Sequence, residues 1–271
     1  MSLSTTKCET GRRTALSRPL ALAALFLALA TTSALAGANS ALIFDASNSM
    51  NSPFDSGSRM EAAKSSLAET VPGFASDLDL GLVVFGHREA LDCNDIEIKL
   101  QSRPGNAARI TSALSSVEAQ GVSGLANTLI KAAEAVDYRN RSASISVLAD
   151  SAGVNNCRVD TCATIERLRQ ESTDLVVHLI AVGTKDAEIP HLQCIASSTG
   201  GHFTRARSRG ELTAGLNRAF ALASQQEQTL EIVLPPRPKP VPRVADADAQ
   251  QRAPDPNGAA AFAPGEIEAE T

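Results

Sequence analysis

Residues 41–50 read ALIFDASNSM, and this stretch decides the fold class. The four apolar residues 41–44 have strand length and no polar interruption, which is typical of a strand buried on both faces of a parallel sheet. Asp45 follows directly, and Ser47 and Ser49 come at alternate positions after it. Because alternate residues of an extended segment point the same way, these three oxygen-bearing side chains are predicted to face one point.

Beyond this stretch, strand-length apolar runs alternate with segments of helical period as far as residue 225. The predicted strands are 80–85, 96–100, 145–149, 175–182 and a short one at Phe203, and the predicted helices are 59–71, 107–118, 126–136, 163–170, 189–198 and 208–223. Alternation of this kind predicts an α/β fold with a doubly wound, mostly parallel sheet of about six strands. Residues 96–100 form a hairpin with 80–85 and supply one antiparallel edge strand.

Two further polar positions belong to the same edge of the predicted sheet. Asp150 ends the strand 145–149, and Ser123 lies in the loop 121–125 that leads into a helix. In open α/β sheets, ligands bind beyond the carboxyl ends of the strands, at the point where strand order reverses. We therefore expect Ser123 and Asp150 to join Asp45, Ser47 and Ser49 there.

Two carboxylates and three hydroxyls are hard oxygen donors, without thiolate or imidazole. Such a set suits Mg²⁺, with Mn²⁺ or Ca²⁺ as alternatives. Taken alone, D-x-S-x-S is more typical of turns and helix caps, where Asp and Ser are common. The D-x-S-x-S motif, the Ser123 loop and Asp150, in this order and at strand ends, together favour the metal site.

These residues resemble the von Willebrand factor type A (VWA) domain and its metal-ion-dependent adhesion site. We expect the domain to span residues 40–225, and the resemblance covers roughly residues 40–223 of it. Asp45, Ser47 and Ser49 match the family's first motif. Ser123 stands where the family usually has threonine. Two loop positions depart from the pattern: Gly124 replaces the usual proline and Ser151 the usual glycine. Further similarities, to an exported bacterial branch of the family, are Gly86-His87-Arg88, Cys93-x-Asp95-Ile96, and Leu192-x-Cys194-Ile195-Ala196 with Thr199-Gly200-Gly201.

The resemblance implies a Rossmann-like VWA fold that binds protein through a divalent metal, in which the ion bridges to an acidic side chain of the partner. It implies no catalysis. A metal-dependent hydrolase is the alternative, although Gly121-Val122-Ser123-Gly124-Leu125 does not match the G-x-S-x-G nucleophile elbow. A structural VWA domain without metal is a further alternative. His87 follows a strand end and is a candidate ligand contact, with a purely structural role favoured.

The two ends of the chain differ from its centre. Residues 1–36 combine basic residues, an apolar run and an A-x-A site at Ala34–Ala36, which predicts a cleaved secretory signal peptide. Residues 226–271 are rich in proline, alanine and acidic residues and are predicted to be a disordered tail. We expect an exported protein, periplasmic or secreted, with no transmembrane segment in the mature chain.

Four cysteines remain after the predicted cleavage, and an even number in an exported chain indicates two disulfides. In the predicted topology, Cys93 and Cys157 lie above the same strand ends, while Cys162 and Cys194 lie on neighbouring helices of one sheet face. This favours the pairs Cys93–Cys157 and Cys162–Cys194. A local Cys157–Cys162 bridge is the main competitor.

The charge of the chain restricts its partners. The formal net charge is −5 and tryptophan is absent, so a nucleic-acid partner, which needs a concentrated basic surface, is not expected. The sequence predicts a protein partner and leaves its identity and the oligomeric state open.

Overall fold

The computed structural model describes residues 38–153 and 157–233, and of residues 227–233 the backbone alone. Its centre is a six-stranded sheet in the order β5-β4-β1-β6-β7-β8. The strands are β1 (Ala38–Asp45), β4 (Leu78–Phe85), β5 (Ile96–Leu100), β6 (Ser142–Ala149), β7 (Asp174–Val182) and β8 (Phe203–Ala206). The predicted signal peptide lies outside the described residues, and so does the predicted tail from residue 234 onward.

The pairing of the strands confirms the predicted fold class. Strands β4, β1, β6, β7 and β8 pair in parallel, and β5 pairs antiparallel with β4 at the edge. After β1 the chain builds outward to β4 and β5, and then returns to add β6 on the other side of β1. Strand order therefore reverses at β1, and the carboxyl end of β1 is the place where such sheets bind ligands.

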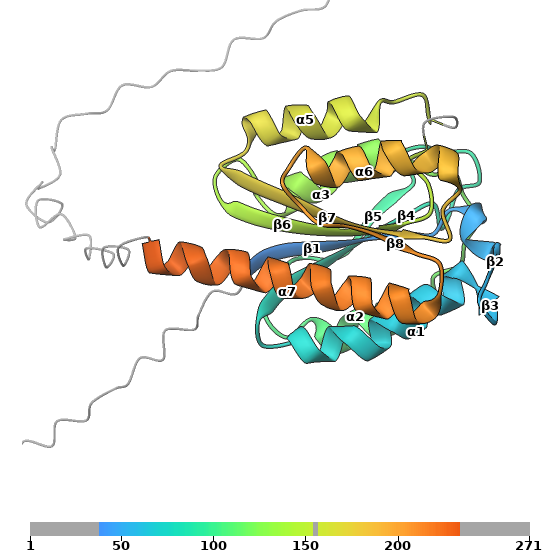
Figure 1. The fold of residues 1–271 in the computed structure, drawn as a ribbon, viewed down its shortest axis with the longest axis horizontal. Helices are drawn as coiled ribbons and strands as arrows, with labels where there is room; N and C mark the ends of the chain where they lie inside the picture. The colour runs from blue at the N-terminus through green and yellow to red at the C-terminus, as the bar shows by residue number, and fades with distance from the viewer. Residues whose placement is uncertain (1–37, 154–156, 234–271) are drawn as a thin grey trace, which may run out of the picture. The chain divides into compact units, whose positions relative to one another are not determined.

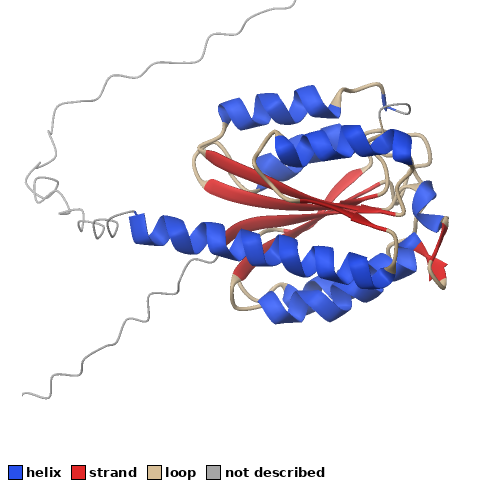
Figure 2. Cartoon of the chain, in the orientation of Figure 1, coloured by secondary structure: helices blue, strands red, loops and turns tan. Residues whose placement is uncertain are grey.

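Helices cover both faces of the sheet, as Figures 1 and 2 show. One face carries α1 (Arg59–Thr70), α2 (Ala107–Ser115) and α7 (Arg209–Val233), and the other carries α3 (Leu125–Ala135), α5 (Thr161–Glu171) and α6 (Ile189–Ser197). Burial alternates along β1: Leu42 and Phe44 pack towards α1 and α7, whereas Ala41 and Ile43 pack towards α3. This explains why residues 41–44 of the strand are all apolar.

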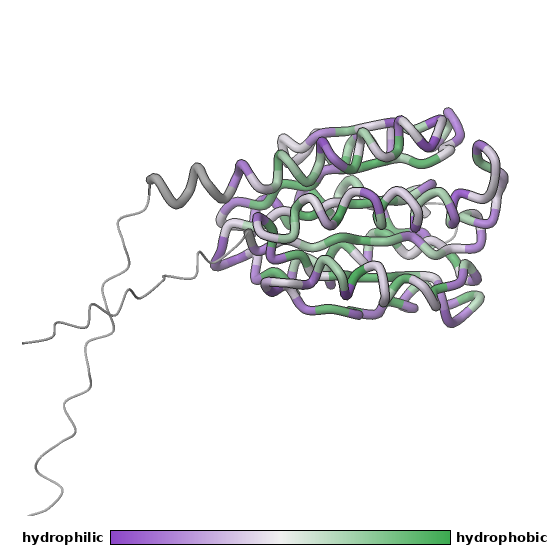
Figure 3. The backbone as a smooth tube through the Cα atoms, turned by 90° about the horizontal axis from the view of Figure 1, so that it is seen from below, coloured by the Kyte–Doolittle hydropathy of each residue, from purple (hydrophilic) through white to green (hydrophobic). Residues whose placement is uncertain are grey.

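The core therefore has two layers, one on each side of the sheet. In Figure 3 the hydrophobic stretches follow the strands and the inner sides of the helices, and the hydrophilic ones lie mainly in loops and outward-facing turns. Leu91, at the tip of the loop between β4 and β5, is the large hydrophobic side chain that the described residues expose, at 88%. No helix in the described part of the chain is long and apolar enough to span a membrane.

The structure differs from the predicted elements at two places. Helix α7 continues to Val233, ten residues beyond the expected end at Ala223. Residues 224–234 contain neither glycine nor proline, and the first residue that must end a helix is Pro235. A short hairpin of β2 (Pro53–Phe54) and β3 (Gly57–Ser58) was also not predicted, because its strands are too short to show a period.

Candidate metal site

The loop after β1 is held in place by its own side chain and by two neighbouring segments. Asp45 is fully buried, and its Oδ1 accepts the backbone N–H of Ser47 at 2.8 Å. The N–H of Ala46 donates to the Phe85 carbonyl at 2.9 Å, and that of Asn48 donates to the Gly121 carbonyl at 2.8 Å. A 3₁₀ turn, η1 (Asn48–Asn51), follows. The loop is therefore fixed to the end of β4 and to the loop that carries Ser123.

Four of the five predicted residues share one hydrogen-bond network. The hydroxyls of Ser47 and Ser49 lie 3.1 Å apart, and the Ser49 hydroxyl donates to Oδ1 of Asp150 at 2.8 Å. The backbone N–H of Asp150 donates to Oδ2 of Asp45 at 3.4 Å, which closes the ring. Asp150 lies more than 100 residues from the other three in sequence, and the topology predicts that it joins them.

Ser123 lies beside this network and is oriented differently. It is buried, and its hydroxyl donates to the Ser151 carbonyl at 3.3 Å, in the loop after Asp150. An isolated parallel bridge between Ser47 and Gly121 keeps its loop next to the D-x-S-x-S turn. Among the described residues, no hydrogen bond of the Ser123 side chain reaches the other four predicted residues. The structure therefore places Ser123 on the rim of the network.

Arg59 also contacts the site, although it was not predicted to do so. It is the first residue of α1, behind the capping box of Ser58 and Glu61, and its Nη1 forms an ion pair with Oδ2 of Asp150. The same Nη1 lies 3.4 Å from the Ser49 carbonyl. Only 13% of the Arg59 side chain is exposed. A guanidinium thus covers one oxygen of the second carboxylate.

The surroundings of Arg59 hold it against that carboxylate. Its Nε is buried without a hydrogen-bond partner among the described residues. Gly183, at the end of β7, has φ +57°, and a Cβ there would lie 2.7 Å from Nε and 3.0 Å from the Phe54 ring. Glycine is required at this position both by the positive φ and by the space that Arg59 occupies. Sequence could have suggested Arg59 only through the start of α1 shortly after the metal motif.

The pKa values of the two carboxylates depend on burial and on the charges around them. Burial, and then the nearby charge of Asp150, raise the pKa of Asp45 to about 8. Burial also raises the pKa of Asp150, although the Ser49 hydrogen bond and the Arg59 charge act in the opposite direction. No ion pair to Asp45 is found within residues 38–153 and 157–233. The Asp45 carboxyl therefore keeps its proton at neutral pH in the metal-free protein. A divalent ion bound there would displace that proton, and the hard oxygen donors around it fit such an ion.

His87 lies beside the candidate site and pairs with a carboxylate of the neighbouring strand. Its ring is largely buried, and Nε2 lies 2.7 Å from Oε2 of Glu97 on β5. The neighbouring Arg88 and Glu89 donate backbone N–H groups to Asp95, whose carboxylate also pairs with the Arg88 side chain at 2.6 Å. These contacts fix the loop between β4 and β5 next to the candidate site.

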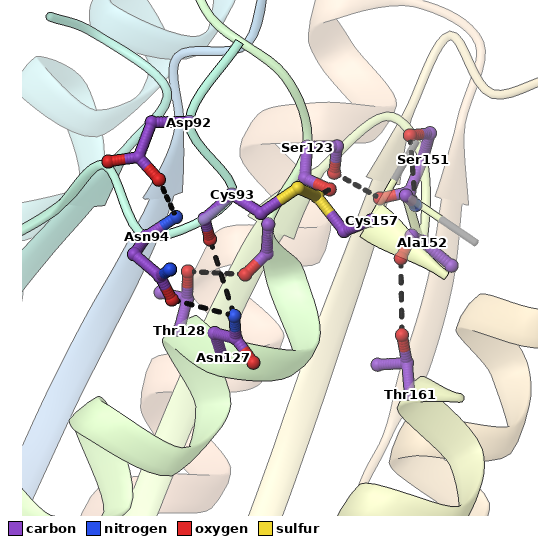
Figure 4. Close-up of a disulfide and its surroundings, with 12 residues drawn as sticks. Asp92, Cys93, Asn94, Ser123, Asn127, Thr128, Ser151, Ala152, Cys157 and Thr161 are labelled. Atoms are coloured by element: carbon purple, nitrogen blue, oxygen red, sulfur yellow. Dashed lines mark hydrogen bonds between the residues drawn. A yellow bond between two sulfur atoms is a disulfide. The ribbon is translucent and has the colours of Figure 1, made fainter. Parts of the chain in front are cut away.

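The two disulfides confirm the favoured pairing. Cys93 pairs with Cys157 and Cys162 pairs with Cys194, with Cα–Cα distances of 5.7 and 5.8 Å. Figure 4 shows the first bridge beside Ser123 and Ser151. Asn127, near the start of α3, donates to Oδ1 of Asn94 at 2.9 Å next to this bridge. The bridge thus joins the loop between β4 and β5 to the loop after Asp150, across the Ser123 loop.

Replacing Cys93 and Cys157 together with serine is expected to lower both stability and metal affinity. The bridge closes a loop over a sequence separation of 64, and its loss should reduce the free energy of unfolding by about 4 kcal/mol. Removing Cys162–Cys194, over a separation of 32, should cost a similar amount but leave the metal loops in place. Thermal unfolding and Mn²⁺ titration of both variants test this. Equal metal affinity in the two variants would show that the first bridge does not order the site.

Comparisons with known proteins place the fold. No protein-family model matches the chain. The chain is 27% identical over 186 residues to "Uncharacterized protein YwmD" of Bacillus subtilis (strain 168), covering 65% of this chain and 82% of that protein. The solved SpRpn10 VWA domain is similar with a TM-score of 0.51 and 16% identity, covering 68% of this chain and 95% of that one.

A second solved structure is proximal thread matrix protein 1 from the mussel byssus, described with a zinc-occupied MIDAS motif. The TM-score is 0.51 and the identity 22%, over 70% of this chain. This chain spans only 46% of that one. At these identities, the likenesses to solved structures show a shared fold.

Proposed function

We propose that this chain, which has the VWA fold, is an exported module that binds another protein through a divalent cation held by Asp45, Ser47, Ser49, Ser123 and Asp150. The observation that carries the proposal is the buried carboxylate of Asp45, which meets Ser47, Ser49 and Asp150 at the switch point of the sheet. When bound, the cation supplies positive charge to which an acidic side chain of the partner binds. Mg²⁺ is the expected ion because the donors are all oxygens.

The residues of this chain have distinct roles in the proposal. Asp45 and Asp150 supply the negative charge, and Ser47 and Ser49 supply neutral oxygens next to them. Ser123, on the rim, would hold the ion only if its hydroxyl turned from the Ser151 carbonyl. The two carboxylates would at most balance the charge of a divalent ion and the hydroxyls are neutral, so an acidic partner group would complete the oxygen ligands around the ion. The role is binding, and we assign no catalytic step to the site.

The position of Arg59 determines whether a cation can reach Asp150. In the metal-free protein its guanidinium neutralises Asp150, and it competes with a cation for Oδ2. The same ion pair favours a second candidate function, a VWA interaction domain that works without metal and keeps Arg59 on Asp150 throughout. The two candidates differ in one respect: only in the first does partner binding depend on a divalent ion.

Export is supported by the two disulfides, which persist in oxidising compartments. It also fits the sequence features of residues 1–36. We therefore propose that the partner is in the periplasm or outside the cell.

Immobilised disulfide-bonded protein tests the metal-dependent candidate. Proteins of the envelope and culture medium are expected to be retained in Mg²⁺ and released by a chelator, and an Asp45→Ala matrix should retain none of them. Retention of the same proteins by both matrices, with or without chelator, would support the metal-free candidate instead.

A further inference from the structure

The loop after Asp150 is held in place through its backbone. The Ser151 carbonyl accepts the hydroxyl of Ser123 at 3.3 Å. The Ala152 carbonyl accepts the hydroxyl of Thr161, the first residue of α5, at 3.1 Å. Figure 4 shows both contacts. The loop is therefore fixed by the Ser123 segment and by the start of α5.

A third contact comes from a side chain that was not predicted to belong to the site. Glu188 is the last residue of the 3₁₀ turn η3 (Asp186–Glu188), which lies between β7 and α6. Its Oε2 accepts the backbone N–H of Ala152 at 3.1 Å. Ala152 comes two residues after Asp150, so Glu188 joins the segment after β7 to the loop that carries the second carboxylate of the site.

The charge of Glu188 also acts on Asp150. Burial is the largest cause that raises the pKa of Asp150, and the Glu188 carboxylate raises it further. Glu188 is half-buried and forms no ion pair within residues 38–153 and 157–233. Asp150 and Glu188 are thus two neighbouring carboxylates, and the guanidinium of Arg59 supplies one positive charge to the pair. The remaining negative charge would attract a cation.

The contact places Glu188 behind the predicted ligands. Its carboxylate meets the backbone of the loop, and among the described residues no hydrogen bond joins Glu188 to the D-x-S-x-S motif. Groups in such outer positions orient the ligands of a metal, and their loss typically weakens metal binding about 10- to 100-fold. Here the group that is held is the backbone of residues 150–152, which positions the Asp150 carboxylate.

We propose that Glu188 is a positioning residue of the candidate metal site, which holds the loop after Asp150 through the Ala152 N–H and adds negative charge that favours a divalent cation. The inference rests on the proposed metal-dependent function. It goes further by assigning a role to a residue of η3, outside the D-x-S-x-S motif, the Ser123 loop and Asp150.

Two substitutions separate the hydrogen bond from the charge. Glu188→Gln keeps an oxygen that can accept the Ala152 N–H and removes the charge, whereas Glu188→Ala removes both. In Mn²⁺ titrations of the disulfide-bonded protein, the Kd is expected to rise about tenfold in Glu188→Gln and about 30-fold or more in Glu188→Ala. Hydrogen exchange of the Ala152 amide, measured without metal, should stay slow in Glu188→Gln and become faster in Glu188→Ala.

Asp186→Asn is the matched control, because it removes one carboxylate from the same 3₁₀ turn. Asp186 is exposed and pairs with Arg205, so its substitution should leave the Kd for Mn²⁺ within about twofold of the wild-type value. Wild-type affinity in Glu188→Gln, or an equal loss in Asp186→Asn, would overturn the inference about Glu188. Unchanged exchange of the Ala152 amide in Glu188→Ala would do the same.

The failure of this inference can be told apart from the failure of the proposed function. If the wild type binds no Mn²⁺, both are overturned. If the wild type binds Mn²⁺ and the two Glu188 variants bind it equally well, the inference about Glu188 alone is overturned.

Discussion

Asp45→Asn is expected to abolish divalent-metal binding while making the metal-free protein more stable. The substitution keeps the shape of the side chain and removes one of the two carboxylates that meet at the end of β1. Metal affinity should fall by about 100-fold or more. Titration calorimetry with Mg²⁺ and Mn²⁺ measures the first effect, and thermal unfolding in the presence of a chelator measures the second.

The gain in stability should increase as the pH rises from 4 to 8. Burial and the neighbouring Asp150 raise the pKa of Asp45 to about 8, from an ordinary 3.8 in the unfolded chain. Below pH 4 the carboxyl is protonated in both states and has no effect on stability. As the pH rises from 4 to 8, the unfolded chain ionises while the folded one resists, so the metal-free wild type loses stability. Asp45→Asn does not lose this stability, because its side chain does not ionise. Above pH 8 its melting temperature without metal should be about 3 °C or more above that of the wild type.

Asp95→Asn is the matched control for this prediction. Asp95 is also a buried carboxylate, but it accepts backbone N–H groups from Arg88 and Glu89 and pairs with the Arg88 side chain. Its pKa is lowered: burial opposes this, and the hydrogen bonds from Glu89 and Arg88 outweigh burial. Removing that charge should therefore destabilise the protein at neutral pH. A loss of stability in both variants would mean that the Asp45 carboxylate is compensated in the folded protein.

Arg59→Gln is expected to tighten metal binding by about tenfold or more. The substitution removes the guanidinium that covers Oδ2 of Asp150 and leaves two carboxylates to face the ion. The metal-free protein should lose about 3 kcal/mol of stability, because Asp150 is then buried without its cation. Saturating Mg²⁺ should restore that stability. Titration calorimetry and thermal unfolding with and without Mg²⁺ measure both effects.

Arg139→Gln is the control for Arg59→Gln, because it removes an arginine that lies outside the candidate metal site. Arg139 pairs with Glu171 on α5 at an exposed position, away from the strand ends, and its substitution should leave metal affinity unchanged. Unchanged or weaker metal binding by Arg59→Gln would show that Arg59 does not compete with the ion. That result would favour the metal-free interaction domain.

The fold could be predicted from this sequence because local patterns and burial agree. Residues 41–44 of β1 are all apolar because helices cover both faces of the sheet, and Ser208 with Glu211 marks the start of α7. The pairing of the four cysteines followed from placing two loops at one sheet end and two helices on one face. The end of α7 was predicted too early, because residues 224–234 include the good helix formers glutamine, glutamate and leucine and only Pro235 requires a stop.

The site was only partly predictable. Asp45, Ser47 and Ser49 lie within five residues, so their common direction follows from the geometry of an extended turn. Asp150 follows from the parallel register of β1 and β6. Arg59 did not follow, because the direction of a long side chain at a helix start depends on packing against Phe54 and Gly183, which no local pattern encodes.

Metal binding at the end of β1 can be seen directly in a crystal structure of the wild-type protein grown with Mn²⁺, with anomalous scattering recorded at the manganese edge. We expect one anomalous peak bounded by Asp45, Ser47, Ser49 and Asp150, with the Ser123 hydroxyl turned towards it and the Arg59 guanidinium moved off Asp150. An Arg59–Asp150 ion pair intact at millimolar Mn²⁺, with no peak beside Asp45, would contradict this expectation.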